Sequence, residues 1–300
     1  MIRCRNFLMR IPRKLNYENS EKLVEYILNV ARKWVSPPYS IDGWRLDVAA
    51  DLGHTAEYNH EFWRRFRQAV KEANPEALIL AEHYGDPASW LEGDQWDSIM
   101  NYDAFMEPVT WFLTGMEKHS DSYNGGIWGD GEAFFNAMGY HMSRMQTNTV
   151  MTAMNQLSNH DHSRFLTRTN QMVGRIQTAG PEKAGQNIKP CVFREAVVIQ
   201  MTWPGAPTLY YGDEAGVCGW TDPDSRRTYP WGKEDLELIE FHRYMTGIHR
   251  KIPAIRKGAV KPLLAGYQKI AYGRMYGKYQ AVVVISNSPD SQTMDIPVWQ

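Results

Sequence analysis

With 300 residues, 22% charged and 43% hydrophobic, the chain has a globular composition and room for one large domain and a small one. The net charge of -1, without a long run of Lys or Arg, argues against a nucleic-acid or anionic-membrane partner. The cysteines, Cys4, Cys191 and Cys218, form neither a metal-binding spacing nor a disulfide framework, which favours a reducing, cytoplasmic location. We find no apolar run of the roughly 20 residues needed for a membrane span, and no secretory signal in residues 1–9.

Helical and strand patterns alternate along most of the chain. Residues 1–18 are basic and irregular, and apolar side chains then recur at helical spacing, with Asn19 or Ser20 as the cap and Pro37-Pro38 as the end. Further helices are expected from about 56 to 74, near 104–117 and 131–147, and around 193–201 and 238–248. Strands are expected at 42–48, 77–82, 96–102, 154–159 and 208–211.

This alternation predicts an α/β fold in which crossover helices join parallel strands. Acidic residues end the strands at Asp47, Glu82 and Asp161. In an α/β barrel the carboxyl ends of the strands carry the chemistry, and in an open doubly wound sheet they line a crevice. A nucleotide-binding fold lacks its fingerprint here, because the chain has neither a G-x-G-x-x-G motif nor a P-loop.

Two later stretches differ from this pattern. Residues 167–189 are polar and contain glycine, which predicts a long loop that shapes the substrate cleft, because it follows the strand bearing Asp161. After Ile252-Pro253, residues 269–276 and 279–286 predict paired strands around a Gly277-Lys278 turn. These strands would begin a small all-β domain.

The strand at 42–48 has an unusual distribution of side chains. Alternation places Arg45 and Asp47 on one face and the apolar residues on the other. The guanidinium of Arg45 can hold the Asp47 carboxylate ionised and oriented, which suits a nucleophile. A purely structural Arg–Asp pair explains residues 42–49 equally well.

Acids at successive strand ends suit retaining glycoside hydrolysis. One carboxylate attacks the anomeric carbon, and a second carboxyl group protonates the leaving oxygen. Asp47 beside Arg45 suits the ionised role, and Glu82 suits the acid role because its apolar strand favours the protonated form. Asp161 beside His160 suits stabilisation of the transition state.

Metal-dependent hydrolysis is the competing interpretation. His160 and His162 flank Asp161, so both imidazoles could face one site and bind a divalent ion together with Asp47 and Glu82. The residue types alone leave both chemistries open.

Several motifs resemble those of the α-amylase family, glycoside hydrolase family 13. Residues 43–49, GWRLDVA, closely resemble the family's fourth-strand motif. Similar matches, in the family's order, are found at 81–83, 159–161, 205–214 and 222–227, the last followed by Trp231. Residues 12–16 are similar to a Met-Pro-Lys-Leu-Asn motif of the neopullulanase and cyclomaltodextrinase subgroup, with one residue extra.

The resemblance implies a role for each matched side chain. Asp47 would be the nucleophile, Glu82 the acid/base and Asp161 the transition-state stabiliser. The implied substrate-binding residues are Arg45, His160 and His83, and the implied partner is an α-glucan oligosaccharide. The chemistry would need no cofactor, and calcium is left open. We interpret the conspicuous polar side chains of the 205–214 segment as structural: Tyr210, Tyr211, Asp213 and Glu214.

This chain differs from the family in its number of barrel strands. The family's barrel has eight strands, and the resemblance here begins just before the fourth. We therefore expect a partial (β/α)8 TIM barrel, strands four to eight, followed by the start of a small all-β domain. Residues 1–18 would be a remnant of the preceding segment, 19–252 the second half of the barrel, and 253–300 the start of a β-sandwich. Five strands cannot close a barrel and would leave unpaired edges.

The expected activity is retaining hydrolysis of α-1,4 bonds, with α-1,6 bonds as a second option, in maltodextrins, cyclodextrins or pullulan. A non-catalytic glucan-binding remnant and an α-glucan transglycosylase are the alternatives. We expect these 300 residues alone to be unstable or poorly active.

Overall fold

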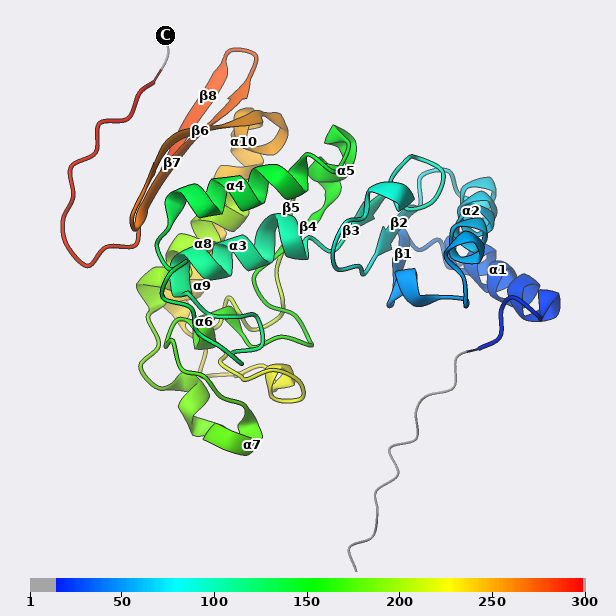
Figure 1. Ribbon diagram of the computed structural model, residues 1–300, viewed down its shortest axis with the longest axis horizontal. Coiled ribbons are helices and arrows are strands. Elements are labelled where there is room, and N and C mark those ends of the chain that lie inside the picture. The colour runs from blue at the N-terminus through cyan, green and yellow to red at the C-terminus, as the bar shows by residue number, and fades with distance from the viewer. Residues whose placement is uncertain (1–14, 299–300) are drawn as a thin grey trace, which may run out of the picture. The chain divides into compact units, whose positions relative to one another are not determined.

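The computed structural model describes residues 15–298, so residues 1–14 and most of the expected N-terminal remnant lie outside the described residues. The chain forms two compact units (Figure 1). The first contains the described residues up to Glu82 together with Glu92–Asp97, and the second contains His83–Leu91 and the chain from Ser98 onward. Each unit is described by itself.

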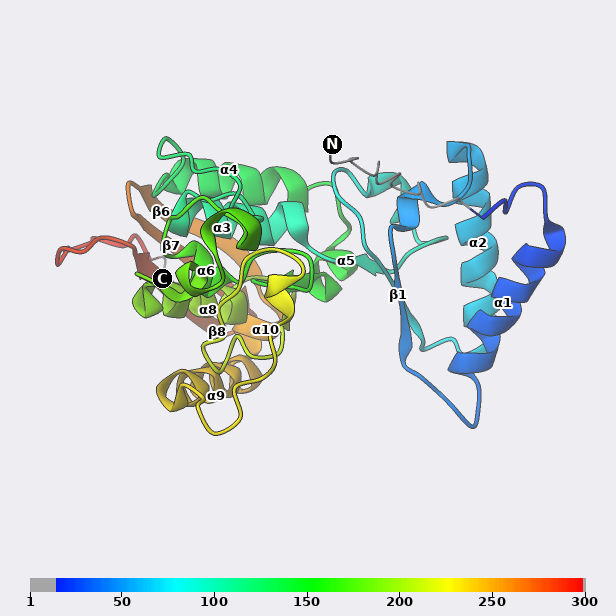
Figure 2. The ribbon, with the colours of Figure 1, turned by 90° about the horizontal axis from the view of Figure 1, so that it is seen from below.

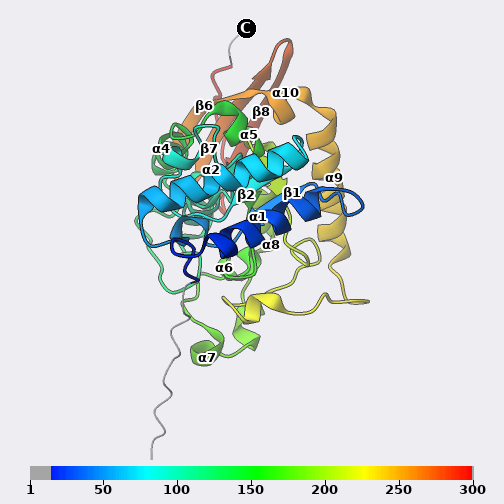
Figure 3. The same ribbon diagram turned by 90° about the vertical axis from the view of Figure 1, so that its right-hand side faces the viewer.

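Two helices and two parallel strands form the first unit. Helices α1 (Glu21–Val35) and α2 (Ala56–Ala73) lie side by side (Figures 2 and 3). Each helix begins after a residue type that commonly caps helix N-termini. The Ser20 and Thr55 side chains accept backbone N–H groups of the first turn. The buried face of α1 is aliphatic, with Val24, Leu28, Ala31 and Val35. The buried face of α2 carries the aromatic residues Phe62, Trp63 and Phe66.

Strands β1 (Gly43–Leu46) and β2 (Leu78–Ala81) pair in parallel. Their register joins Gly43 to Leu78 and Leu46 to Ala81, so the two strands end at the same level. The predicted strands at 42–48 and 77–82 are thereby confirmed in shorter form. A short 3-10 helix, η1 (Ala49–Asp51), follows β1.

The first part of the second unit contains short strands of the predicted partial barrel and the helices between them. Its strands are β3 (Ser98–Ile99), β4 (Met154–Gln156) and β5 (Ala206–Thr208), and β4 pairs in parallel with β5. The helices before β4 are η3 (Tyr102–Met106), α3 (Glu107–Thr114), α4 (Gly131–Met142) and α5 (Thr147–Thr152). Those after it are α6 (Phe165–Arg168), α7 (Ile176–Ala179), α8 (Pro190–Thr202), α9 (Leu236–Lys251) and α10 (Pro253–Lys257).

Several boundaries differ from the sequence expectation. The strand expected at 96–102 is two residues long, because the backbone enters a π-type turn in which Met106 N–H donates to Asn101 O. The last strand lies at Ala206–Thr208, earlier than the expected 208–211, and contains Pro207. The expected loop at 167–189 contains helix α7 and a 3-10 turn, Glu182–Gly185.

An antiparallel sheet follows α10. Strands β7 (Lys269–Tyr276) and β8 (Tyr279–Ser286) match the predicted pair, and Gly277 adopts a φ of 56° in the turn between them. The sequence expectation lacked β6 (Ala259–Gly266), which pairs with β7 and shifts register between Pro262 and Leu264. Side chains of β7 and β8 share one hydrophobic core with α3, α8 and α9.

Strands β1 to β5 are the five barrel-type strands that the sequence predicted, and the described residues show parallel pairs rather than a closed barrel. Within residues 15–298, no helix combines the length and apolar character needed to cross a membrane.

Glu195 on α8 should make stability depend on pH. Burial raises the pKa of its carboxyl group from 4.5 to about 7, and among the described residues Oε2 has no hydrogen-bond partner. The folded state then keeps a proton that the unfolded state releases, so stability falls as the pH rises from about 4.5 to about 7 and stays low above it.

We therefore expect Glu195→Gln to stabilise the protein by about 2 kcal/mol at pH 8 and to have little effect near pH 4. Thermal unfolding at both pH values measures the effect, with the exposed Glu132→Gln as the matched control. Equal shifts for both variants at pH 8 would contradict the assignment.

Candidate active site

The two carboxylates of the first unit follow its paired strands. Because Leu46 is the register partner of Ala81, the next residues, Asp47 and Glu82, leave the sheet at the same edge. The backbone continues this pairing for one more step, since Glu82 N–H donates to Leu46 O over 2.9 Å. Parallel β-pairing thus brings together two acids that are 35 positions apart in the sequence.

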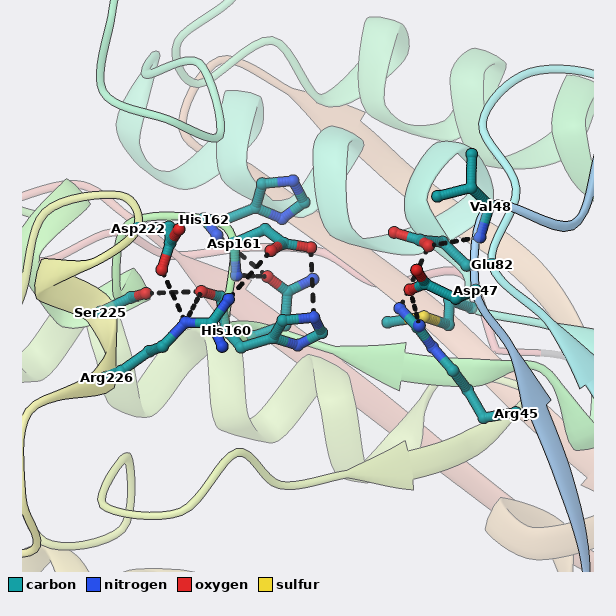
Figure 4. Close-up of polar contacts among 12 residues, drawn as sticks. Arg45, Asp47, Val48, Glu82, His160, Asp161, His162, Asp222, Ser225 and Arg226 are labelled. Atoms are coloured by element: carbon teal, nitrogen blue, oxygen red, sulfur yellow. Dashed lines mark hydrogen bonds and ion pairs between the residues drawn. The ribbon is translucent and has the colours of Figure 1, made fainter. Parts of the chain in front are cut away.

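Arg45 links these two acids (Figure 4). Its Nη1 donates to Asp47 Oδ1, and its Nη2 lies 3.3 Å from Glu82 Oε2. The predicted Arg45–Asp47 pair is therefore present, and the same guanidinium also reaches Glu82. One cation fixes the orientation of both carboxylates.

The two carboxylates have different surroundings. The Asp47 side chain is 77% exposed, whereas that of Glu82 is 8% exposed. Glu82 Oε2 also accepts the backbone N–H of Val48 over 2.9 Å. An accessible carboxylate beside a buried carboxyl group is the asymmetry that separate nucleophile and acid roles need.

Val48 does not lie on the apolar face that strand alternation predicts. Its φ of 42° is left-handed, and its side chain is exposed. The strand ends at Leu46, and the turn that follows aims Val48 N–H at Glu82. A β-branched residue in this region is strained, and such strain is commonly found at functional sites.

Asp161 in the second unit is held by a side-chain turn. After β4, the Oδ1 atom of Asn159 accepts the backbone N–H groups of Asp161 and His162 over 2.9 and 3.0 Å. The strand expected at 154–159 ends at Gln156, so this turn, rather than sheet pairing, positions the acid.

His160 and Arg226 contact the Asp161 carboxylate from separate segments (Figure 4). His160 Nε2 lies 3.4 Å from Oδ2, and Arg226 Nη2 lies 3.6 Å from Oδ1. Arg226 also donates from Nε to His160 O and to Asp222, which fixes its guanidinium. About one-third of the Asp161 side chain remains exposed, so a ligand can reach it.

Sequence reasoning did not single out Arg226, although it lies in the matched 222–227 segment. Two adjacent arginines occur there, and the sequence does not distinguish them. Arg227 forms an ion pair with Asp224 and donates to Pro181 O, so it braces its own loop.

The two histidines beside Asp161 do not share a site, which corrects the expectation that both could bind one metal. His160 lies beside Asp161, whereas His162 is fully buried and hydrogen-bonds the Tyr84 hydroxyl over 3.0 Å. Burial lowers the pKa of His162 to about 2, so this imidazole is neutral. Within the described residues, no three His, Cys, Asp or Glu side chains are grouped to hold a metal ion.

The remaining predicted residues have local partners. His83 follows Glu82 in the chain but belongs to the second unit, where its ring lies 4.9 Å from that of Trp90. Buried Asp213 forms an ion pair with Arg164, whose guanidinium lies over Tyr210 and Tyr211.

Comparison with known proteins identifies the family of this chain. The model of the alpha amylase catalytic domain matches residues 5–254. The chain belongs to the α-amylase family. This confirms the resemblance indicated by the motifs, and the matched range contains Asp47, Glu82 and Asp161.

Two relatives of this α-amylase-family chain are a neopullulanase and a cyclomaltodextrinase. It is 36% identical to neopullulanase 2 of Thermoactinomyces vulgaris over 97% of this chain and 44% of that protein. It is 34% identical to a cyclomaltodextrinase of Thermoanaerobacter pseudethanolicus over 95% of this chain and 43% of that protein. The chain thus spans less than half the length of these relatives.

A similar solved structure contains a saccharide ligand. The cyclic α-maltosyl-(1→6)-maltose hydrolase of Arthrobacter globiformis, in complex with that saccharide, aligns with a TM-score of 0.71 and 28% identity. The alignment covers 89% of this chain and 52% of that one.

Proposed function

We propose that the protein containing this chain is a retaining glycoside hydrolase that cleaves α-1,4 glucosidic bonds of maltodextrins and cyclodextrins. The supporting observation is the Arg45 bridge, which orients an exposed and a buried carboxylate at the ends of paired strands. The family membership and the maltosyl saccharide bound by a homologous structure support the substrate class. Cleavage of α-1,6 bonds, as in pullulan, is a second activity to be assayed.

Asp47 is the proposed nucleophile. Its carboxylate is accessible, and the ion pair with the Arg45 guanidinium limits its rotation. Attack on the anomeric carbon would form a glycosyl ester, which water then hydrolyses, so the product keeps the anomeric configuration of the substrate.

Glu82 is the proposed acid and, in the second step, the base. Oε2 accepts Val48 N–H and lies beside Arg45, so we assign the transferable proton to Oε1. Its low exposure limits exchange of this proton with solvent. Protonation of the leaving oxygen leaves a carboxylate that can then activate water.

Asp161 is the proposed stabiliser of the oxocarbenium-like transition state. His160 and Arg226 hold its two oxygens separately, which leaves a fixed negative charge aimed by Asn159. Such a preorganised charge stabilises a developing cation without reorganising during the reaction. His83 is proposed as a further sugar contact.

The direct test is incubation of the complete gene product, and of these 300 residues alone, with maltotriose, β-cyclodextrin and pullulan. Products are identified by chromatography, and their initial anomeric form by NMR. Release of α-anomers supports the proposal, and β-anomers contradict it. Glucan binding without cleavage would favour a non-catalytic protein, and longer oligosaccharide products a transglycosylase.

Arg226→Lys is expected to lower kcat/KM for maltotriose about 10-fold. Lysine keeps the charge but cannot contact Asp161, Asp222 and His160 O with one planar group. The matched control is Arg243→Lys on α9, which changes only an exposed ion pair with Glu240. Equal activity of the two variants would remove Arg226 from the site.

A further inference from the structure

The segment that follows Glu82 is anchored in the second unit at three successive residues. The Tyr84 hydroxyl hydrogen-bonds His162 Nε2 over 3.0 Å, and Gly85 N–H donates to Asp103 Oδ2 over 2.9 Å. Asp86 forms an ion pair with Arg144 at 3.2 Å. Because the Arg144 pair is between exposed side chains, the Tyr84 bond to a fully buried imidazole is the more restrictive contact.

His162 is packed as a structural group. Its ring makes edge contacts with the rings of Tyr102 and His119, at 5.4 and 4.7 Å between centroids. A neutral imidazole in this position can neither act as a charge at the site nor rotate freely, so Nε2 is a fixed partner for the Tyr84 hydroxyl.

These contacts form a closed network with Asn159, the residue that holds Asp161. Asn159 Oδ1 accepts the N–H groups of both Asp161 and His162, and its Nδ2 donates to the Tyr102 hydroxyl over 3.2 Å. Tyr102 in turn stacks on Tyr84 at 4.2 Å with the rings 11° apart. The same asparagine thus supports both Asp161 and the stacked pair of Tyr84 and Tyr102.

We propose that Tyr84 and His162 are positioning residues that restrain the backbone immediately after the proposed acid, Glu82. The acid is joined to Tyr84 by two peptide bonds, so the orientation of Tyr84 constrains the backbone of Glu82. Neither side chain takes part in proton transfer. The inference rests on the proposed function of Glu82.

The test compares two substrates that differ in their need for an acid. Maltotriose requires protonation of a sugar leaving group, whereas α-maltotriosyl fluoride releases fluoride with little protonation. Tyr84→Phe keeps the ring, its stacking and any sugar contact, and removes only the hydroxyl. We expect Tyr84→Phe and His162→Phe each to lower kcat on maltotriose about 10-fold or more, and to change kcat on the fluoride much less.

The double variant should lose no more than the worse single variant, because both changes remove the same hydrogen bond. Tyr244→Phe on α9 is the matched control, since its side chain is exposed and lies outside this network. Equal losses on both substrates, or additive losses in the double variant, would overturn the proposal, because a merely structural role predicts no dependence on the leaving group.

Hydrogen exchange gives a readout that does not need activity. Amides of residues 83–91 should exchange several-fold faster in Tyr84→Phe than in wild type, and unchanged exchange would also overturn the proposal. If the complete wild-type gene product cleaves neither substrate, the proposed function fails, and the exchange comparison then decides by itself whether the pair restrains the loop.

Discussion

Replacing Asp47 with asparagine is expected to lower hydrolysis of maltotriose by roughly 10³-fold or more. The amide is a poor nucleophile, and it can still accept a hydrogen bond from Arg45 through its oxygen, so the loss should reflect chemistry rather than folding. Initial rates on maltotriose, with thermal unfolding to verify the fold, measure the effect in the complete gene product.

Asp42→Asn is the matched control for this prediction. Asp42 precedes β1, at the opposite end of the same strand, and its side chain is exposed. Its variant should keep activity close to wild type. A folded Asp47→Asn variant with more than a tenth of wild-type activity would exclude Asp47 as the nucleophile.

Replacing Glu82 with glutamine should give the second large loss, again roughly 10³-fold on maltotriose. Glutamine can accept Val48 N–H through its side-chain oxygen, but it cannot donate a proton to the leaving sugar. A substrate with a fluoride leaving group bypasses the acid, so cleavage of α-maltotriosyl fluoride should fall far less. The ratio of the two rates is the measurement.

The control for the second variant is Glu76→Gln, which changes an exposed carboxyl group shortly before β2. It should affect neither substrate. Equal losses of Glu82→Gln on maltotriose and on the fluoride would show that Glu82 does not act as the acid in bond cleavage.

The sequence predicted the placement of Asp47 and Glu82 because strand alternation and apolar runs are local properties. Arg45 and Asp47 are two residues apart on one strand, so their contact required no knowledge of the rest of the fold. The hairpin of β7 and β8 was equally local, since a Gly277-Lys278 turn separates two strand patterns.

Other features depend on pairing between distant segments. The second contact of Arg45, with Glu82, requires the register of β1 on β2. The choice of Arg226 over Arg227 depends on which guanidinium the 222–227 loop turns toward Asp161. The hydrogen bond of buried His162 with Tyr84 joins residues that are 78 positions apart in the sequence. Periodicity carries no information about such contacts.

Some errors were local but involved uncommon backbone geometry. Val48 was expected on the apolar face of a strand, and it adopts a left-handed φ that β-branched residues rarely have. Strand β6 contains Pro262 and ends at Gly266, two residues that disfavour a strand in propensity-based reasoning. Helix α7 has only four residues, too short to show a helical period.

Covalent trapping tests most directly whether Asp47 attacks the sugar. The complete gene product is incubated with an activated 5-fluoro-α-glucosyl fluoride, which slows hydrolysis of the glycosyl ester, and is then digested and analysed by mass spectrometry. We predict one glycosyl adduct, on the peptide that contains Asp47, and its absence in Asp47→Asn. An adduct on another carboxylate, or turnover of natural substrate with inverted product, would contradict a retaining mechanism through Asp47.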